Sequence, residues 1–286
     1  MSKLKIVVTG ASGFIGGHLI DHLSKIPKTE VVALTRRSNP NLRNVVDYTY
    51  APAGDVLIHL AENNDMGEVS AMGLVYENSA LSTIHSLITK KYSRIIYASS
   101  AILYGDQTHV PHGTGEQVFV NSTYARVKRH VEEVVLGHPQ GTILRLSNVY
   151  GPKMSTNNVV SQILNQIPIP GELVVKDVGP VRDFIWVNDV VEAISAVSLH
   201  EISEKRGSEI YNLGSGIGTS IGDLARLALD LSNQPERRVV SENQPNLNSS
   251  LILDYSKTTI AFDWAPRTFL RQGLSNMLNS NYLVKK

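Results

Sequence analysis

A glycine-rich segment near the start of the chain limits what it can fold into more than any other feature. Residues 9–16 read Thr-Gly-Ala-Ser-Gly-Phe-Ile-Gly and directly follow the apolar run 6–8. Glycine permits the unusual turn from a strand into a helix, and it lets the backbone approach a pyrophosphate closely. Amides at the start of that helix then face the phosphates. The segment predicts a turn that binds a dinucleotide cofactor. The residues expected to contact the cofactor are Gly10, Ser12, Gly13, Phe14, Ile15 and Gly16.

Short apolar runs rich in β-branched residues alternate with stretches of helical spacing through the first half of the chain. The runs lie at 6–8, 31–34, 56–58, 95–97 and 142–144, and helical spacing is clear at 15–26 and 80–90. Nearly continuous apolar strands separated by helices are typical of a parallel sheet that is buried on both faces. We therefore expect an α/β protein with a Rossmann-type doubly wound parallel sheet. The short link 39–54 holds a predicted third strand at 45–48 and leaves little room for a crossover helix.

The pattern loosens after about Gly151, where prolines and glycines become frequent and single helices and short strands follow. One of these helices, at 220–231, begins with a serine that can cap it. We interpret residues 1–150 as a dinucleotide-binding domain and residues 151–286 as a smaller C-terminal substrate-binding lobe that is partly interleaved with it.

The second predicted strand ends in Thr35, Arg36 and Arg37. NAD sites usually place a carboxylate about 20 residues beyond the glycines, where it binds the ribose 2′-hydroxyl. Two guanidinium groups would instead attract a 2′-phosphate. The sequence thus favours NADP(H), with NAD(H) as the alternative.

Tyr124 and Lys128 stand four residues apart, so a helix would carry them on one face. A neighbouring positive charge favours the phenolate form of a tyrosine, whose pKa is otherwise about 10. Such a tyrosine could exchange a proton with a substrate hydroxyl or carbonyl. Ser100 ends another predicted strand, at the sheet edge where doubly wound folds bind ligands, and could hydrogen-bond the same substrate oxygen.

Taken together, these motifs resemble the extended short-chain dehydrogenase/reductase family, especially its nucleotide-sugar epimerases, dehydratases and ketoreductases. The resemblance implies that Ser100, Tyr124 and Lys128 are the catalytic triad and that Tyr124 and Lys128 also hold the cofactor. It further implies that Leu60 and Ala61, in the run His-Leu-Ala at 59–61, lie beside the nicotinamide half. The remaining residues that it assigns contact the diphosphate of the substrate: Asn148 in the run Ser-Asn-Val-Tyr-Gly-Pro, and Arg182 in the run Arg-Asp-Phe.

Several positions depart from that family pattern. Glu62 replaces the usual second alanine of the motif after His59, and no arginine occurs between residues 241 and 253, where many relatives carry one. Ala101 and Ile102 stand where dehydratases of the family carry Asp-Glu. This last difference argues against 4,6-dehydration.

We therefore expect an NADPH-dependent reductase of a keto sugar linked to a nucleoside diphosphate, of the 4-keto-6-deoxy type. The same triad would serve an NAD(P)-dependent nucleotide-sugar epimerase, which is the first alternative. A protein that senses a dinucleotide without catalysis is an alternative of another class.

Composition bears on partners and location. The 27 basic and 26 acidic residues leave a net charge of +1, too balanced for a surface devoted to nucleic acid. The absence of cysteine excludes disulfides and thiolate metal sites. No apolar stretch is long enough to span a membrane, and no secretory signal precedes the first strand, so we expect a cytoplasmic protein.

His18 and His22 are read as ordinary histidines and not as a metal site. The family resemblance suggests a homodimer.

Overall fold

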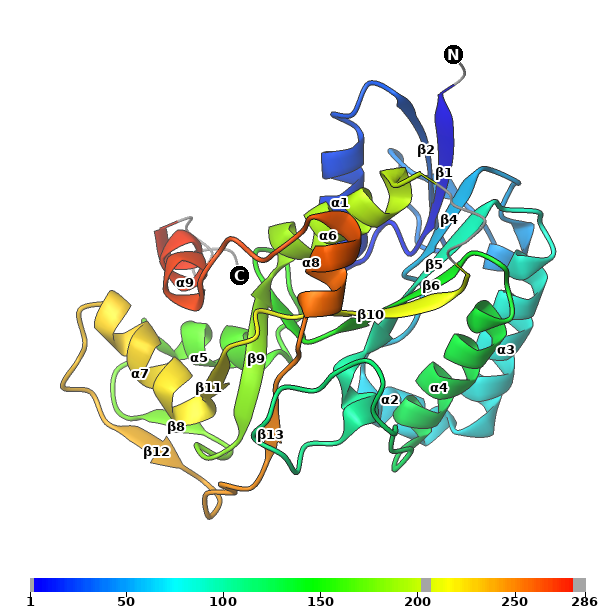
Figure 1. The fold of residues 1–286 in the computed structure, drawn as a ribbon. Coiled ribbons are helices and arrows are strands. Elements are labelled where there is room, and N and C mark those ends of the chain that lie inside the picture. Colours follow the sequence, from blue (N-terminus) through cyan, green and yellow to red (C-terminus); the bar gives the residue numbers. More distant parts are fainter. Residues whose placement is uncertain (1–2, 202–206, 280–286) are drawn as a thin grey trace.

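The structure is a computed structural model, and it describes residues 3–201 and 207–279. Figure 1 shows a large sheet with its covering helices on the right and a smaller lobe on the left, built around α5, α7 and α9. The α/β class and the Rossmann-type doubly wound sheet expected from the sequence are confirmed.

Seven parallel strands form the large sheet in the order β10-β6-β5-β4-β1-β2-β3. The strands are β1 (Leu4–Thr9), β2 (Thr29–Thr35), β3 (Arg43–Asn44), β4 (Val56–His59), β5 (Arg94–Ser100), β6 (Gly141–Leu146) and β10 (Glu209–Leu213). Neighbouring side chains in a strand point to opposite faces. Ile6 and Val8 accordingly enter one apolar core and Val7 enters another, so both faces of the sheet are buried.

Helices cover each face of this sheet (Figure 1). On one face lie α1 (Phe14–Leu23), α6 (Val187–Leu199) and α8 (Ser256–Phe262). On the other lie α3 (Leu74–Ile88) and α4 (Thr123–Leu136), with the short α2 (Met66–Met72) beside α4. The helices expected at 15–26 and 80–90 therefore exist, with α1 ending three residues earlier and α3 starting six residues earlier than expected.

The third strand was wrongly expected at 45–48. The structure places it at β3 (Arg43–Asn44), and residues Tyr48–Tyr50 form one 3-10 turn, η1. The Asp47 carboxylate accepts a hydrogen bond from the Thr49 amide at 2.8 Å, and such local bonds compete with strand pairing. Tyr48 is buried beneath this turn. Among the described residues, η1 takes the place of a crossover helix between β3 and β4.

The lobe contains two small sheets. In the larger, β9 (Val181–Trp186) lies between β11 (Gly218–Ser220) and β13 (Ser250–Leu251) and also pairs with β7 (Asn148–Tyr150). In the smaller, β8 (Leu173–Val175) pairs with β12 (Val239–Ser241). The lobe helices are α5 (Val159–Gln166), α7 (Ile221–Leu231) and α9 (Leu270–Asn279). Ser220 caps α7 by accepting from the Asp223 amide at 3.0 Å, as expected from the sequence.

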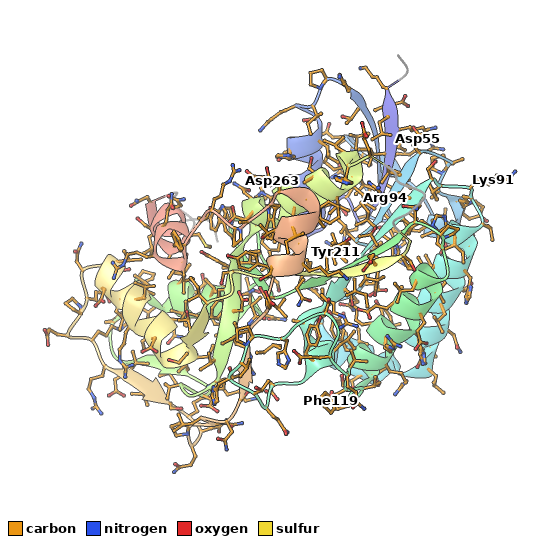
Figure 2. All side chains as sticks on the ribbon, viewed as in Figure 1. Asp55, Lys91, Arg94, Phe119, Tyr211 and Asp263 are labelled. Atoms are coloured by element: carbon orange, nitrogen blue, oxygen red, sulfur yellow. The ribbon has the colours of Figure 1, made fainter. Side chains whose placement is uncertain are left out.

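The direction of the strands decides where a ligand can bind. Figure 2 labels Asp55, just before β4, and Arg94, the first residue of β5, at the amino end of the large sheet. The opposite, carboxyl ends of β1, β4, β5 and β6 lie toward the lobe, and the register pairs Thr9 with His59 and His59 with Tyr97. No helix of the described chain is long and apolar enough to cross a membrane.

Candidate active site

The glycine-rich turn leaves β1 and leads into α1, and two of its glycines are required by geometry. Gly10 has a φ of +73°, and a Cβ there would lie 2.8 Å from the backbone of Leu60 and 2.9 Å from that of Ala61. A Cβ on Gly16 would lie 2.2 Å from the Gly10 carbonyl oxygen. The turn thus packs tightly against the start of its own helix and against the segment after β4. Two segments that the sequence assigned to the cofactor are in this way brought into contact.

The start of α1 is suited to an anion. Its N-cap residue, Gly13, provides no side-chain acceptor for the amides of the first turn, which therefore remain available to phosphate oxygens. Ser12 is tied to the end of β2 through a 2.7 Å hydrogen bond between its Oγ and the Thr35 Oγ1.

A cavity of about 370 Å³ opens over this turn. Beside the residues of the turn, its lining includes four polar residues that the sequence did not assign to a ligand: Asp21, Asn39, Asn41 and Lys153. Lys153 follows β7 and comes from the far half of the chain. No local motif marks it, because only the folded chain brings it to the turn.

Arg36 and Arg37 follow β2 and are exposed. The Arg36 guanidinium lies 5.2 Å from the centre of the Tyr48 ring, within range of a cation–π contact. The Arg37 amide donates to the Thr35 Oγ1 at 3.0 Å, which holds the backbone at the end of the strand. Both cations thus lie just beyond the end of β2, the strand that pairs with β1, and neither lines the cavity over the glycine-rich turn.

The three residues expected to form the catalytic triad come from β5 and α4. Ser100 ends β5, and its Oγ accepts a hydrogen bond from the Ile102 amide at 3.3 Å. Tyr124 lies in the first turn of α4, whose N-cap Ser122 accepts from the Ala125 amide at 3.1 Å. Lys128, one turn later, donates to the Ala98 carbonyl at 2.9 Å, and its Nζ lies 5.6 Å from the centre of the Tyr124 ring. The Lys128 bond joins α4 to β5 two residues before Ser100.

Glu62 is a fourth polar group at this place. Its Oε2 lies 2.7 Å from the Lys128 Nζ and accepts a hydrogen bond from the Tyr97 hydroxyl at 2.7 Å. The side chains of Glu62 and Lys128 are each only 7% exposed. Burial lowers the pKa of Lys128, but the nearby Glu62 carboxylate outweighs burial, so the pKa is raised overall and the ammonium stays charged.

Behind the triad lies a buried ion pair that the sequence did not reveal. Glu132, one turn after Lys128, accepts two hydrogen bonds from Arg145 of β6, at 2.9 and 2.7 Å. The Ser99 hydroxyl donates to the same carboxylate at 2.6 Å. Both charged side chains are almost fully buried. The four-residue spacing of Lys128 and Glu132 indicates that both lie on one face of a helix. The pairing of Glu132 with Arg145 could not be predicted, because it depends on how α4 packs on β6.

The two residues expected to hold a diphosphate differ in their surroundings. Asn148 begins β7 and is partly buried. The Arg182 guanidinium donates to the Ser249 Oγ at 2.8 Å and to Asp106 at 3.3 Å, so it is already engaged by the lobe and by the segment between β5 and α4. Asp183, next to it, is buried and accepts from the backbone amides of the loop after β10. That carboxylate fixes the strand that presents Arg182.

No group of acidic, histidine or cysteine side chains suited to a metal occurs in the described part of the chain. His18 bonds through its Nε2 with the Pro152 carbonyl at 2.8 Å. His59 is fully buried, and burial lowers its pKa to about 4. Its Nδ1 lies 2.8 Å from the Thr9 hydroxyl, so it is a neutral packing residue of the sheet edge.

Comparisons with known proteins agree with this geometry. Residues 6–214 match the model of the NAD dependent epimerase/dehydratase family. UDP-glucuronic acid decarboxylase 6 of Arabidopsis thaliana is 26% identical over 307 residues, covering 96% of this chain and 88% of that relative.

Two solved structures show the same fold. UDP-glucose 4-epimerase from Thermotoga maritima, solved with UDP-glucose, superposes with a TM-score of 0.83 at 22% identity and covers 96% of this chain and 98% of its own. RMD from Pseudomonas aeruginosa, complexed with NADPH, also gives a TM-score of 0.83 at 22% identity and covers 99% of each chain.

Proposed function

The chain belongs to the NAD dependent epimerase/dehydratase family, enzymes of the extended short-chain dehydrogenase/reductase type, and on that premise we propose that it is an NADPH-dependent reductase. Its cofactor is a nicotinamide dinucleotide. Its proposed substrate is a nucleoside diphosphate that carries a keto sugar, of the 4-keto-6-deoxy class. The observation that carries the proposal is that Lys128 lies against both the Tyr124 ring and the Ala98 carbonyl, two residues before Ser100, at the sheet edge from which the glycine-rich turn also leaves.

The residues present fit a dinucleotide. The glycines at 10 and 16 let the turn pack closely against the segment after β4 and against its own helix, and the uncapped start of α1 supplies amides for the oxygens of a pyrophosphate. Leu60 and Ala61 would flank the nicotinamide half, and Lys128 with Tyr124 would hold its ribose. Arg36 and Arg37 would meet a 2′-phosphate, which supports NADPH over NADH.

When bound, the reduced nicotinamide supplies the hydride that the carbonyl carbon gains. Tyr124 would donate its phenolic proton to the carbonyl oxygen, which becomes the hydroxyl of the product. Ser100 would donate a hydrogen bond to that oxygen and stabilise the negative charge that develops on it. Asn148 and Arg182 would bind the diphosphate and so orient the sugar ring toward Tyr124. Arg182 would exchange part of its contact with Asp106 and Ser249 for this role.

An epimerase is the second candidate, and the likeness to a UDP-glucose 4-epimerase favours it. An epimerase would remove hydride from a sugar carbon and return it to the opposite face, with Tyr124 acting first as base and then as acid. The bound cofactor would accept that hydride and give it back, so each cycle would end with the cofactor oxidised and without an external reductant. Arg36 and Arg37 tilt the choice toward NADPH and hence toward net reduction.

Turnover with a panel of keto sugar nucleotides tests the proposal. The enzyme, mixed with NADPH, should consume the reduced cofactor with at least one of them, as followed by nicotinamide absorbance. Tyr124→Phe should lower kcat by about 10²–10⁴-fold, the range expected when a general acid is lost. Its affinity for NADPH should stay close to that of the parent protein.

Two results would overturn this assignment. Protein purified with bound NAD that interconverts two sugar nucleotides without added cofactor would establish the epimerase. Binding of NADPH without oxidation by any candidate would favour a dinucleotide-sensing role.

A further inference from the structure

We infer that Glu62 is a positioning residue: it holds Lys128 and offsets its positive charge, so that Tyr124 keeps its proton near neutral pH and is set to act as a proton donor. The inference rests on the proposed function, because donation to a carbonyl is the role that reduction requires of Tyr124. It explains why an acidic side chain stands where the related motif has alanine.

The contacts of Glu62 are specific and buried. One oxygen, Oε2, accepts hydrogen bonds from both the Lys128 ammonium and the Tyr97 hydroxyl, each at 2.7 Å. Lys128 donates a second hydrogen bond to the Ala98 carbonyl at 2.9 Å. The ammonium is thus fixed between the end of β5 and the segment after β4. From there its Nζ lies 4.9 Å from the centre of the Tyr97 ring and 5.6 Å from the centre of the Tyr124 ring.

Burying the Glu62 carboxylate is energetically unfavourable, which indicates that its negative charge has a role. The second oxygen, Oε1, is buried and has no hydrogen-bond partner among the described residues. Leaving a buried acceptor unpaired is unfavourable, because the oxygen loses its bonds to water and gains none. A glutamine or a smaller polar residue could satisfy Tyr97 and Lys128 without the desolvation of a full charge. The negative charge itself is what those alternatives lack.

Other charged and titratable groups around the pair do not replace this effect. On β4, His59 is neutral because burial lowers its pKa to about 4. On β5 and α3, Tyr97 and Tyr76 are neutral, since burial followed by the field of Glu62 raises the pKa of each. Glu132 on α4 is paired with Arg145, and Arg36 lies exposed at the end of β2. Glu62 is therefore the group that directly balances Lys128.

The consequence concerns the direction of proton transfer. A buried ammonium alone beside Tyr124 would favour the phenolate, which accepts protons and suits oxidation. An ammonium paired with a carboxylate exerts a much weaker field on the phenol oxygen. The neutral phenol then predominates over a wider pH range, and the site is prepared for reduction.

The experiment titrates Tyr124 in the free protein, with no cofactor or sugar present. Tyrosine ionisation is followed by near-ultraviolet absorbance, and the difference between each protein and its Tyr124→Phe counterpart isolates Tyr124. Glu62→Gln keeps the size and the hydrogen-bonding oxygen but removes the charge. We expect the Tyr124 titration of this variant to move to lower pH by at least about one unit, which is the size of effect that removing one buried charge close to a titrating group has.

Two controls separate charge from structure. Glu62→Asp restores the charge on a shorter side chain and should return the titration toward that of the parent protein. Glu68→Gln removes an exposed carboxylate of α2 and should leave the titration unchanged. An unmoved titration in Glu62→Gln, or an equal shift in Glu62→Asp, would overturn the inference.

A second measurement keeps this inference distinct from the proposed function. With an accepted keto sugar nucleotide, the pH profile of NADPH oxidation by Glu62→Gln should move to lower pH, with activity lost sooner on the alkaline side. If no substrate is turned over while Tyr124 still titrates as expected, the reductase assignment fails and the role of Glu62 stands. If turnover is normal and neither profile moves, only the role of Glu62 fails.

Discussion

Single atoms decide the shape of the dinucleotide turn. Gly10 has a positive φ and lies against the backbone after β4, whereas a Cβ on Gly17, one turn into the same helix, would meet nothing within 4 Å. The two glycines are seven residues apart and differ in how much space surrounds them. Gly10 is required by backbone conformation and packing, whereas Gly17 lowers helix stability and leaves open space beside the cavity over the turn.

Gly10→Ala should lower the free energy of unfolding by about 1–3 kcal/mol, because it combines an unfavourable φ with a close backbone contact. Its affinity for NADPH should fall more than tenfold, since Leu60 and Ala61 would be pushed from the turn. Gly17→Ala is the matched control and should raise stability by up to about 1 kcal/mol. Denaturant unfolding and calorimetric titration measure both, and a Gly10→Ala protein that binds NADPH normally would contradict the account.

At the scale of elements, α4 carries Tyr124 and Lys128 of the candidate triad, and a cap at its start and buried polar contacts to the sheet fix its position. The Ser122 cap sets where the helix begins, and therefore which way Tyr124 faces. Further along, Glu132 joins α4 to β6 through Arg145 and to β5 through Ser99. Between these points Lys128 bonds to the Ala98 carbonyl. The helix cannot slide along the sheet without breaking a buried polar contact.

Arg145→Met should destabilise the protein by about 3–5 kcal/mol, because it leaves the buried Glu132 carboxylate with only the more distant Arg129 guanidinium, at 3.9 Å, to balance its charge. The double variant Glu132→Leu with Arg145→Met removes both charges and should recover much of that loss. Glu133→Gln, at an exposed position beside Glu132, should cost less than about 1 kcal/mol. Chemical unfolding measures all three, and a double variant weaker than Arg145→Met would refute the unpaired-charge explanation.

At the scale of the whole molecule, the chain crosses between its two parts more than once. β10 comes from the second half yet pairs with β6 in the large sheet. Likewise α6 comes from the second half and packs on α1, and residues of both elements share one apolar core with β1 and β4. Asp183 on β9 joins the parts again. Its carboxylate accepts hydrogen bonds from the Ser215 amide, just after β10, and from the Leu253 amide, just after β13.

A fragment of residues 1–150 should therefore fail to fold cooperatively, although it contains the predicted dinucleotide domain. It would expose the α1 face that α6 covers and the edge of β6 that β10 pairs with. Circular dichroism and thermal unfolding, compared with the full chain, test this. A fragment that unfolds in a sharp transition and binds NADPH would show that the domain is independent of the second half.

Much of the fold and of the candidate site is predictable from local pattern. The run of glycines at 9–16 and the alternating apolar segments indicate the doubly wound sheet, since strand burial and helix spacing are read over a few residues. Ser100, Tyr124 and Lys128 follow from one strand end and one helix face. The third strand was misplaced, because the bond from Asp47 to the Thr49 amide competes with pairing in a way that apolar pattern does not reveal.

The sequence by itself determined the type of fold and indicated the candidate phosphate-binding turn, because each is read from residues close together in the chain, and the family resemblance added the candidate triad. Only the tertiary structure decided that Glu62 neutralises Lys128, that Arg145 pairs with Glu132, and that Lys153 faces the turn. These contacts join segments that are distant in sequence. Their strength comes from burial and from distances of a few ångströms, which exist only once the sheet has assembled.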